Sequence, residues 1–247
     1  MGHLRRAGVG PRPGRRLPAG DPEHARRTGG TGGLSYHAYL FDLDGTLVDT
    51  APDLSQALNH TLAKAGLEPV DEALTRHWVG HGVRAMLEAA FRHHDRHASE
   101  PDLDASQNVL VDHYREHIAD YSRPYGGVAE TLDTLARRAP LAVVTNKPTD
   151  LSNKLLDALD LAGFFRVVVG RGTTSRFKPD PQPAHYACER LGVQPAAALF
   201  IGDSETDVLC ARAAGCDVVL YRHGYNHGRD PDTLGADRVI DSLSALV

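Results

Sequence analysis

The chain has 247 residues, of which 41% are hydrophobic and 24% are charged, and this balance excludes a wholly disordered or fibrous protein. Its formal net charge is −5 at pH 7, and residues 36–247 carry 20 basic against 30 acidic residues, so the acidic body has no general affinity for nucleic acid. No run of 18 apolar residues offers a transmembrane helix, and the three cysteines form no CxxC pattern. We therefore expect a protein of the reducing cytoplasm with neither a membrane nor a nucleic-acid partner.

The first 35 residues differ in composition from the rest of the chain. They are rich in Arg, Gly and Pro, and they show no hydrophobic periodicity that could bury a face. The arginine pairs in this stretch are not followed by the apolar segment that an export signal needs. We expect residues 1–35 to be a disordered leader.

From residue 36 onward, short apolar runs alternate with stretches of helical length. Strands are predicted at Tyr36–Phe41, Leu141–Val144, Val167–Val169, Ala198–Ile201, Val218–Leu220 and Val239–Ile240. Helices are predicted at Val128–Arg138, Asp150–Leu159, Pro183–Leu191 and Glu205–Ala214. This alternation predicts an α/β fold with a doubly wound parallel sheet, in which ligands bind beyond the carboxyl ends of the strands.

Residues 52–123 interrupt the alternation, because they read as consecutive helices without a convincing strand. Apolar side chains share one helical face in each of Leu54–Ala65, Met86–Phe91 and Val109–His117. The segment starts just after an acidic cluster and ends before the next helix of the core, so it is placed to form a helical cap over the strand ends. The core then consists of residues 36–51 and 124–247, with Pro52 and Pro124–Gly127 as hinge segments.

The strongest local signal follows the first strand and reads Asp42-Leu43-Asp44-Gly45-Thr46-Leu47-Val48-Asp49. Asp42 and Asp44 can face one pocket if the chain leaves the strand conformation there. One ionised carboxylate could then attack a phosphoryl group while the other donates a proton to the leaving oxygen. Polar residues also follow two later strands, Thr145-Asn146 after one and Asp203 after the other.

Four motifs in this order resemble those of haloacid dehalogenase superfamily phosphatases. They are DxDGTLxD at Asp42–Asp49, Thr145, Lys178 before Pro-Asp-Pro, and the acidic pair Asp203 and Asp207. The resemblance covers residues 36 to about 243. It implies the Rossmannoid core of this superfamily with an inserted helical cap, and hydrolysis of a phosphomonoester.

The resemblance also implies a role for each motif residue. Asp42 would be the nucleophile that forms an aspartyl-phosphate, and Asp44 would act first as acid and then as base. Thr145, Lys178 and the amide of Asn146 would stabilise the phosphoryl group. Mg²⁺ would be the cofactor, held by Asp42, the backbone carbonyl of Asp44, and Asp203, with Asp207 orienting these ligands.

Several stretches resemble phosphoglycolate phosphatases in particular: Leu47–Leu54, Trp78–Arg84, His113–Glu116, Thr145–Pro148 and Tyr221–Asn226. The expected reaction is therefore hydrolysis of a small phosphorylated metabolite, 2-phosphoglycolate, by a monomer or homodimer. Gly80 and Gly82 would let the backbone approach the substrate, and Arg84 or His81 could meet its carboxylate. The chain departs from these phosphatases at Gly170-Arg171-Gly172, where they usually have Gly-Gly-Asp, so Arg171 could serve a phosphosugar or point to solvent.

Other functions stay open at this point. A phosphosugar phosphatase acting on a substrate such as N-acetylmuramate 6-phosphate is the first alternative. A pyrophosphatase, a phosphosugar mutase and a non-catalytic phosphate-binding module follow it. Asp42 and Asp44 together argue against the binding module, because binding alone does not need both carboxylates.

Overall fold

The computed structural model of the protein describes residues 35–247. The expected disordered leader, residues 1–35, lies outside this range except for Ser35. None of the helices in residues 35–247 combines the length and the apolar character that crossing a membrane requires.

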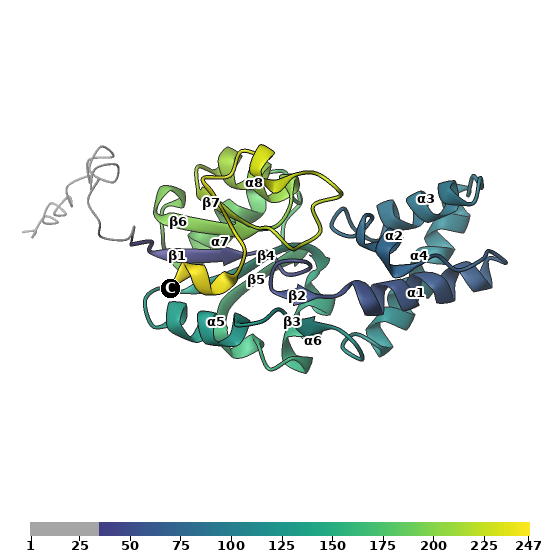
Figure 1. Ribbon diagram of the computed structural model, residues 1–247, viewed down its shortest axis with the longest axis horizontal. Coiled ribbons are helices and arrows are strands. Elements are labelled where there is room, and N and C mark those ends of the chain that lie inside the picture. The colour runs from purple at the N-terminus through teal and green to yellow at the C-terminus, as the bar shows by residue number, and fades with distance from the viewer. Residues whose placement is uncertain (1–34) are drawn as a thin grey trace, which may run out of the picture. The chain divides into compact units, whose positions relative to one another are not determined.

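A six-stranded parallel sheet forms the centre of the described part of the chain (Figure 1). Its strands are β1 (Ala38–Phe41), β4 (Leu141–Pro148), β5 (Phe165–Arg171), β6 (Ala198–Gly202), β7 (Asp217–Tyr221) and β8 (Arg238–Ile240). They are arranged in the order β5-β4-β1-β6-β7-β8, and every neighbouring pair is parallel. The chain builds one side of the sheet from β1 to β5 and then the other side from β6 to β8, which confirms the predicted doubly wound fold.

Four helices cover the two faces of this sheet. They are α5 (Val128–Ala136), α6 (Thr149–Ala158), α7 (Gln182–Leu191) and α8 (Glu205–Ala214). Tyr39 and Phe41 of β1 pack in one buried cluster with α5 and α6, whereas Ala38 and Leu40 pack in the other with α7 and α8. Burial on both faces explains why the strands appear in the sequence as continuous apolar runs.

The observed strand bounds differ from the predicted ones, and β5 (Phe165–Arg171) extends two residues beyond each end of the predicted Val167–Val169. Parallel pairing of β1 with β6 begins at Ala38 opposite Ala198, so the predicted start at Tyr36 is two residues early. Strand β4 continues to Pro148, and Thr145-Asn146 therefore lie within it rather than after it. The pairing of β4 with β1 ends at Val143, and its register with β5 shifts between Val144 and Pro148. The polar end of β4 thus extends beyond the end of β1.

Four further helices lie between the first strand and α5, beyond the arrowhead of β1 in Figure 1. They are α1 (Ala51–Lys64), α2 (Glu72–Arg76), α3 (Val83–His93) and α4 (Glu100–Glu116). We refer to α1–α4 as the cap helices. Helix α2 is not among the predicted helices, because five residues are too few to show a helical period. The division of residues 35–247 into a core and a cap at residues 52 and 123 stays a prediction.

The two chain segments that lead into and out of the cap helices pair with each other. They form an antiparallel ribbon of β2 (Val48–Asp49) and β3 (Arg123–Pro124), two strands that the sequence did not predict because each has only two residues. Pro52, expected in a hinge, lies in the first turn of α1, where its missing N–H leaves no hydrogen bond unmade. The two segments are therefore joined by a hydrogen-bonded ribbon, and the expected hinge role of Pro52 and Pro124–Gly127 stays a prediction.

Candidate active site

The predicted site residues come together where three neighbouring strands end. Strand β1 lies between β4 and β6, and Asp42 directly follows it. Thr145 belongs to the polar end of β4, and Asp203 directly follows β6. All three side chains are buried. Because parallel strands end at the same edge of a sheet, this edge is the place where such a fold binds its ligand.

Lys178 lies between two carboxylates at this edge. Its Nζ atom is 2.8 Å from Asp42 Oδ1 and 2.6 Å from Asp207 Oδ1, and all three side chains are buried. Burial raises the pKa of Asp42 to about 7 even though the Lys178 cation lowers it. Burial also opposes the charge on Lys178, but Asp207 and Asp42 outweigh it and raise the pKa of this lysine. Lys178 therefore stays charged and favours the ionised form of Asp42.

Three buried carboxylates converge beside this lysine. One oxygen atom from each of Asp42, Asp203 and Asp207 lies within 4.8 Å of the other two. Burial raises the pKa of Asp203 well above its ordinary value, and the neighbouring carboxylates of Asp207 and Asp42 raise it further. A single lysine cannot neutralise three carboxylates, whereas a divalent cation with oxygen ligands would balance the excess charge. The residues present fit such an ion.

Asp207 was expected to orient the ligands, and its carboxylate is also a member of this cluster. Its two oxygens already accept hydrogen bonds from Lys178, Ser204 and the N–H of Asp203, so its orienting role stays a prediction. The proposed contribution of Asp44 through its backbone carbonyl stays a prediction.

The start of α8 explains the spacing of the acidic pair. Asp207 Oδ2 accepts hydrogen bonds from the backbone N–H groups of Asp203 at 3.2 Å and Ser204 at 3.1 Å, and from Ser204 Oγ at 2.7 Å. Asp207 thereby caps the helix with one oxygen and binds Lys178 with the other. The same carboxylate serves local structure and the charge balance of the site.

Asp203 is held in place from two further segments. Thr46 Oγ1 donates a hydrogen bond to Asp203 Oδ1 at 3.1 Å, and the backbone N–H of Tyr225 donates to Asp203 Oδ2. Gly45 has a φ of +87°, and a Cβ atom at this residue would lie 2.2 Å from Asp203 Oδ2. The glycine of the first motif is therefore required both by the turn and by the close approach of Asp203.

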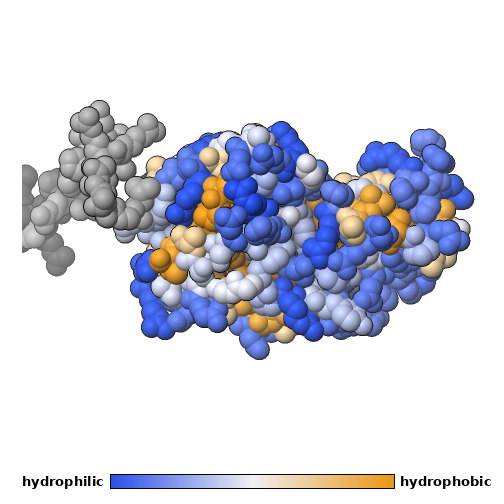
Figure 2. All heavy atoms as spheres, in the orientation of Figure 1, coloured by the Kyte–Doolittle hydropathy of each residue, from blue (hydrophilic) through white to orange (hydrophobic). Residues whose placement is uncertain are grey.

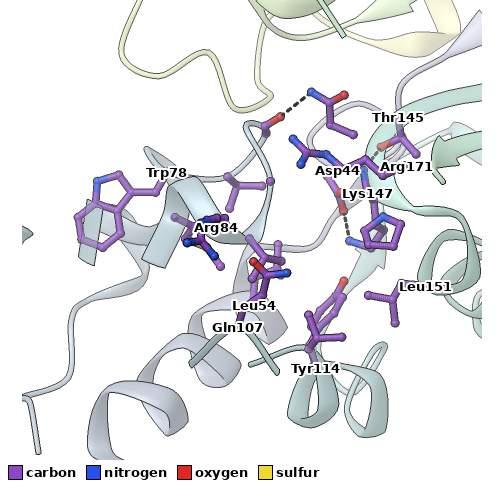
Figure 3. Close-up of a pocket in the computed structure, with 18 of the residues that line it drawn as sticks. Asp44, Leu54, Trp78, Arg84, Gln107, Tyr114, Thr145, Lys147, Leu151 and Arg171 are labelled. Carbon is purple, nitrogen blue, oxygen red and sulfur yellow. Dashed lines mark hydrogen bonds and ion pairs between the residues drawn. The ribbon is translucent and has the colours of Figure 1, made fainter. Parts of the chain in front are cut away.

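Lys147 is a site residue that the sequence analysis did not single out. Its Nζ atom is 2.7 Å from Asp44 Oδ1 and 4.6 Å from the centre of the Tyr114 ring of α4 (Figure 3). Burial opposes its charge, but Asp44 and Tyr114 outweigh this effect and raise the pKa of Lys147. The available signal was its position two residues after Thr145 in a strand, since such residues share one face. Lys147 holds the carboxylate of Asp44 in the site.

Asp49, the last residue of the first motif, lies at the root of the cap helices. Its carboxylate accepts two hydrogen bonds from Arg76 of α2, at 2.9 and 2.8 Å, and one from the hydroxyl of Tyr225 at 2.5 Å. Burial opposes its ionisation, but Arg76 and Tyr225 outweigh this effect of burial and lower the pKa of Asp49. Asp49 thus connects a cap helix with the loop that holds Asp203.

A cavity that is open to solvent lies beside these residues (Figure 3). The sheet edge contributes Asp42, Asp44 and Thr145 to its wall. The cap helices and the connection between α2 and α3 contribute mostly apolar side chains: Leu54, Trp78, Val83, Met86 and Val111. Figure 2 shows a hydrophobic area over the cap helices on the side toward the sheet. The cavity therefore joins a charged reaction end to an apolar end.

The expected cap residues line this cavity in different ways. Gly80 and Gly82 are part of its wall, and the carbonyl of Gly80 accepts a hydrogen bond from Asn146 Nδ2 at 3.3 Å. Arg84 also lines it, but its guanidinium binds Glu100 and Asp104 of α4 and lies 3.7 Å from Glu88. These carboxylates already neutralise Arg84, which argues against its expected contact with a substrate carboxylate. The ring of His81 packs against that of His227, with 4.3 Å between their centres.

The family model of haloacid dehalogenase-like hydrolases matches residues 39–221. The chain belongs to this family. It is 40% identical over 212 residues to an N-acetylmuramic acid 6-phosphate phosphatase of Pseudomonas aeruginosa, covering 85% of this chain and 92% of that protein. It is 45% identical over 209 residues to a phosphoglycolate phosphatase of Caulobacter vibrioides, covering 82% and 86% respectively.

Solved structures agree with the family assignment. The crystal structure of a predicted phosphoglycolate phosphatase from Haemophilus somnus 129PT matches with a TM-score of 0.82 and 32% identity, covering 87% of this chain and 98% of that one. The resemblance seen in the four motifs is thus confirmed, and the chain is a haloacid dehalogenase-like hydrolase of the phosphatase type.

Proposed function

We propose that this haloacid dehalogenase-like hydrolase is a Mg²⁺-dependent phosphatase that converts 2-phosphoglycolate to glycolate and phosphate through an aspartyl-phosphate on Asp42. The observation that carries the proposal is the meeting of Asp42, Lys178 and the Asp203–Asp207 pair at the sheet edge, with Asp44 held beside them by Lys147. Phosphoryl transfer depends mainly on positioning and charge neutralisation, which is what this arrangement supplies.

Each residue has a task in the first half-reaction. An oxygen of the ionised Asp42 carboxylate attacks the phosphorus atom, and the bond from phosphorus to the substrate oxygen breaks. Asp44 donates its proton to the departing glycolate oxygen. Thr145 Oγ1 accepts a hydrogen bond from the N–H of Lys147 at 3.2 Å, so its own hydrogen is free to donate to a phosphoryl oxygen. Asp42 and Asp203 would hold Mg²⁺, with Asp207 orienting them, and the ion would neutralise phosphoryl charge.

The second half-reaction restores the enzyme. Asp44, now ionised, takes a proton from water, and the water oxygen attacks the phosphorus of the aspartyl-phosphate. Inorganic phosphate leaves, and Asp42 regains its carboxylate. Lys147 keeps Asp44 directed into the site during both steps, since the two groups are 2.7 Å apart and Lys147 is buried.

N-acetylmuramate 6-phosphate is a second candidate substrate, and two observations favour it. A relative that is 40% identical carries the name N-acetylmuramic acid 6-phosphate phosphatase. Leu54, Trp78 and Met86 also give the cavity an apolar wall. The two carbons of glycolate are too few to contact all three side chains. An N-acetyl sugar would use these walls.

Phosphate release from 2-phosphoglycolate, N-acetylmuramate 6-phosphate and pyrophosphate tests the proposal, with Mg²⁺ or with EDTA. We expect release that requires Mg²⁺, and in Asp42→Asn a loss of more than about 10³-fold because the nucleophile is removed. Asp157→Asn makes the same chemical change on an exposed residue of α6 and should behave as wild type. Wild-type rates in Asp42→Asn would refute the mechanism, whereas a preference for the sugar phosphate would replace only the substrate.

A further inference from the structure

Arg171, the last residue of β5, reaches from the sheet edge toward the cap helices. The backbone pairs with Pro148 of β4, and the Arg171 carbonyl accepts a hydrogen bond from Thr149 Oγ1 at 3.2 Å. The side chain lines the same cavity as Asp44 and Thr145 (Figure 3). A guanidinium is thus present in the substrate cavity but outside the reaction centre formed by Lys178 and the carboxylates.

The guanidinium of Arg171 is held in place before any substrate binds. Its central carbon lies 3.9 Å from the centre of the Phe177 ring, and Nη2 donates a hydrogen bond to the carbonyl of His81 at 2.9 Å. Gly82, with a φ of +96°, leaves room for it, because a Cβ atom there would lie 2.8 Å from Nη2. A preorganised guanidinium loses little side-chain freedom when it binds an anion.

No carboxylate within residues 35–247 forms an ion pair with Arg171. Its Nε atom is buried and has no hydrogen-bond partner in this part of the chain. Burial lowers the pKa of Arg171, and no neighbouring negative charge opposes that effect. A half-buried cation without a counter-ion is costly unless a ligand supplies the missing charge.

Arg84 provides the contrast within the same cavity. Its guanidinium is engaged by Glu100 and Asp104, so it has no need of a further anion. Of the two arginines that line the cavity, Arg171 is the one whose charge is not balanced.

We propose that Arg171 binds a carboxylate carried by the leaving group of the phosphomonoester and so selects substrates that contain one. This inference rests on the proposed phosphatase function and names its specificity-determining residue. Both candidate substrates have such a group: 2-phosphoglycolate on the carbon next to the phosphate ester, and N-acetylmuramate 6-phosphate on its lactyl ether. A guanidinium can bind a carboxylate through two parallel hydrogen bonds.

Two matched substrate pairs test the proposal and distinguish the sources of the carboxylate. The first pair is 2-phosphoglycolate and 2-hydroxyethyl phosphate, and the second is N-acetylmuramate 6-phosphate and N-acetylglucosamine 6-phosphate. In each pair the second compound lacks the carboxylate. For the pair that contains the true substrate, we expect the wild-type enzyme to have a kcat/KM about 10- to 100-fold higher with the carboxylate, as expected for hydrogen bonds to a charged group.

Arg171→Gln removes the charge but keeps an amide that can donate to the His81 carbonyl. We expect kcat/KM for the carboxylate substrate to fall about 10- to 100-fold, mostly through KM, and kcat/KM for its matched partner to change less than about 3-fold. Arg171→Lys should retain part of the preference, because it restores the charge without the planar fork. Arg166→Gln makes the same change at an exposed arginine of β5 and should leave the preference intact.

An equal loss for both members of the pair in Arg171→Gln would overturn the proposal, because Arg171 would then bind the phosphate or only hold the His81 loop. A wild-type enzyme that does not distinguish the members of either pair would overturn it as well. Either result leaves the phosphatase function standing, since Mg²⁺-dependent turnover and its loss in Asp42→Asn are measured separately.

Discussion

Asp53 offers a sharp test of how the cap helices are attached. It lies in the first turn of α1 and is 1% exposed. Its carboxylate accepts hydrogen bonds from the backbone N–H groups of Tyr121 at 3.0 Å and Ser122 at 2.8 Å, and from Ser122 Oγ at 2.6 Å. One side chain therefore joins the segment that enters the cap helices to the segment that leaves them.

The structure allows the cost of Asp53→Ala to be worked out. Ser122 is fully buried, so its N–H and its hydroxyl would both lose their acceptor, whereas the exposed Tyr121 has access to water. An unsatisfied buried polar group costs about 1–3 kcal/mol, and two such groups predict a loss of about 3 kcal/mol in the free energy of unfolding. Asp53→Asn keeps one acceptor oxygen and should lose about 1 kcal/mol.

Urea-induced unfolding measures these free energies, and amide hydrogen exchange at Ser122 reports the local effect. Asp157→Ala, on the exposed side of α6, is the matched control and should stay within about 0.5 kcal/mol of wild type. The reasoning would be refuted if Asp53→Ala lowered the free energy of unfolding by less than about 1 kcal/mol, or if the Ser122 amide exchanged no faster than in wild type. The hydrogen bonds of Asp53 would then not hold together the two segments that enter and leave the cap helices.

Two further predictions concern Lys147 and His81. Lys147→Met removes the group that directs Asp44, so we expect kcat in steady-state assays to fall about 10²-fold with little change in KM; an unchanged kcat would show that Asp44 needs no partner. Burial and His227 lower the pKa of His81 below its usual 6.5, so the unfolded chain binds this proton first as the pH falls. The contribution of His81 to the free energy of unfolding should therefore be constant above pH 6.5 and decrease below it. His81→Gln should lessen this decrease in Tm between pH 7.5 and 5.5, and an identical pH dependence would contradict it.

Much of the fold and reaction centre could be predicted from the sequence. The strands of the sheet are buried on both faces, so they leave continuous apolar runs such as Leu141–Val144 that are visible without a structure. Because parallel strands end at one edge, the polar residues after those runs had to meet there. Asp42 and Asp203 are together in the structure for this reason, whereas Lys178 lies in the loop between β5 and α7 and was expected from the family resemblance.

Other features are too local or too short to leave a pattern. The ribbon of β2 and β3 has two residues in each strand, and α2 has five, so neither shows a period. Lys147 is adjacent to recognised motif residues, but its pairing with Asp44 joins residues 103 positions apart in the chain. Such a contact depends on how β4 is placed beside β1.

The sequence by itself determined the doubly wound sheet, because buried strands leave apolar runs. Its motifs also indicated the residues that we propose for phosphoryl transfer. Only the tertiary structure decided which arginine of the cavity is available to a substrate. The sequence analysis expected Arg84 or His81 to meet the substrate carboxylate and left the role of Arg171 open. Folding brings α4 against Arg84 and supplies its carboxylates, whereas Arg171 meets a carbonyl and an aromatic ring. Charge balance in a cavity is set by neighbours distant in sequence, and those neighbours exist only once the helices have packed.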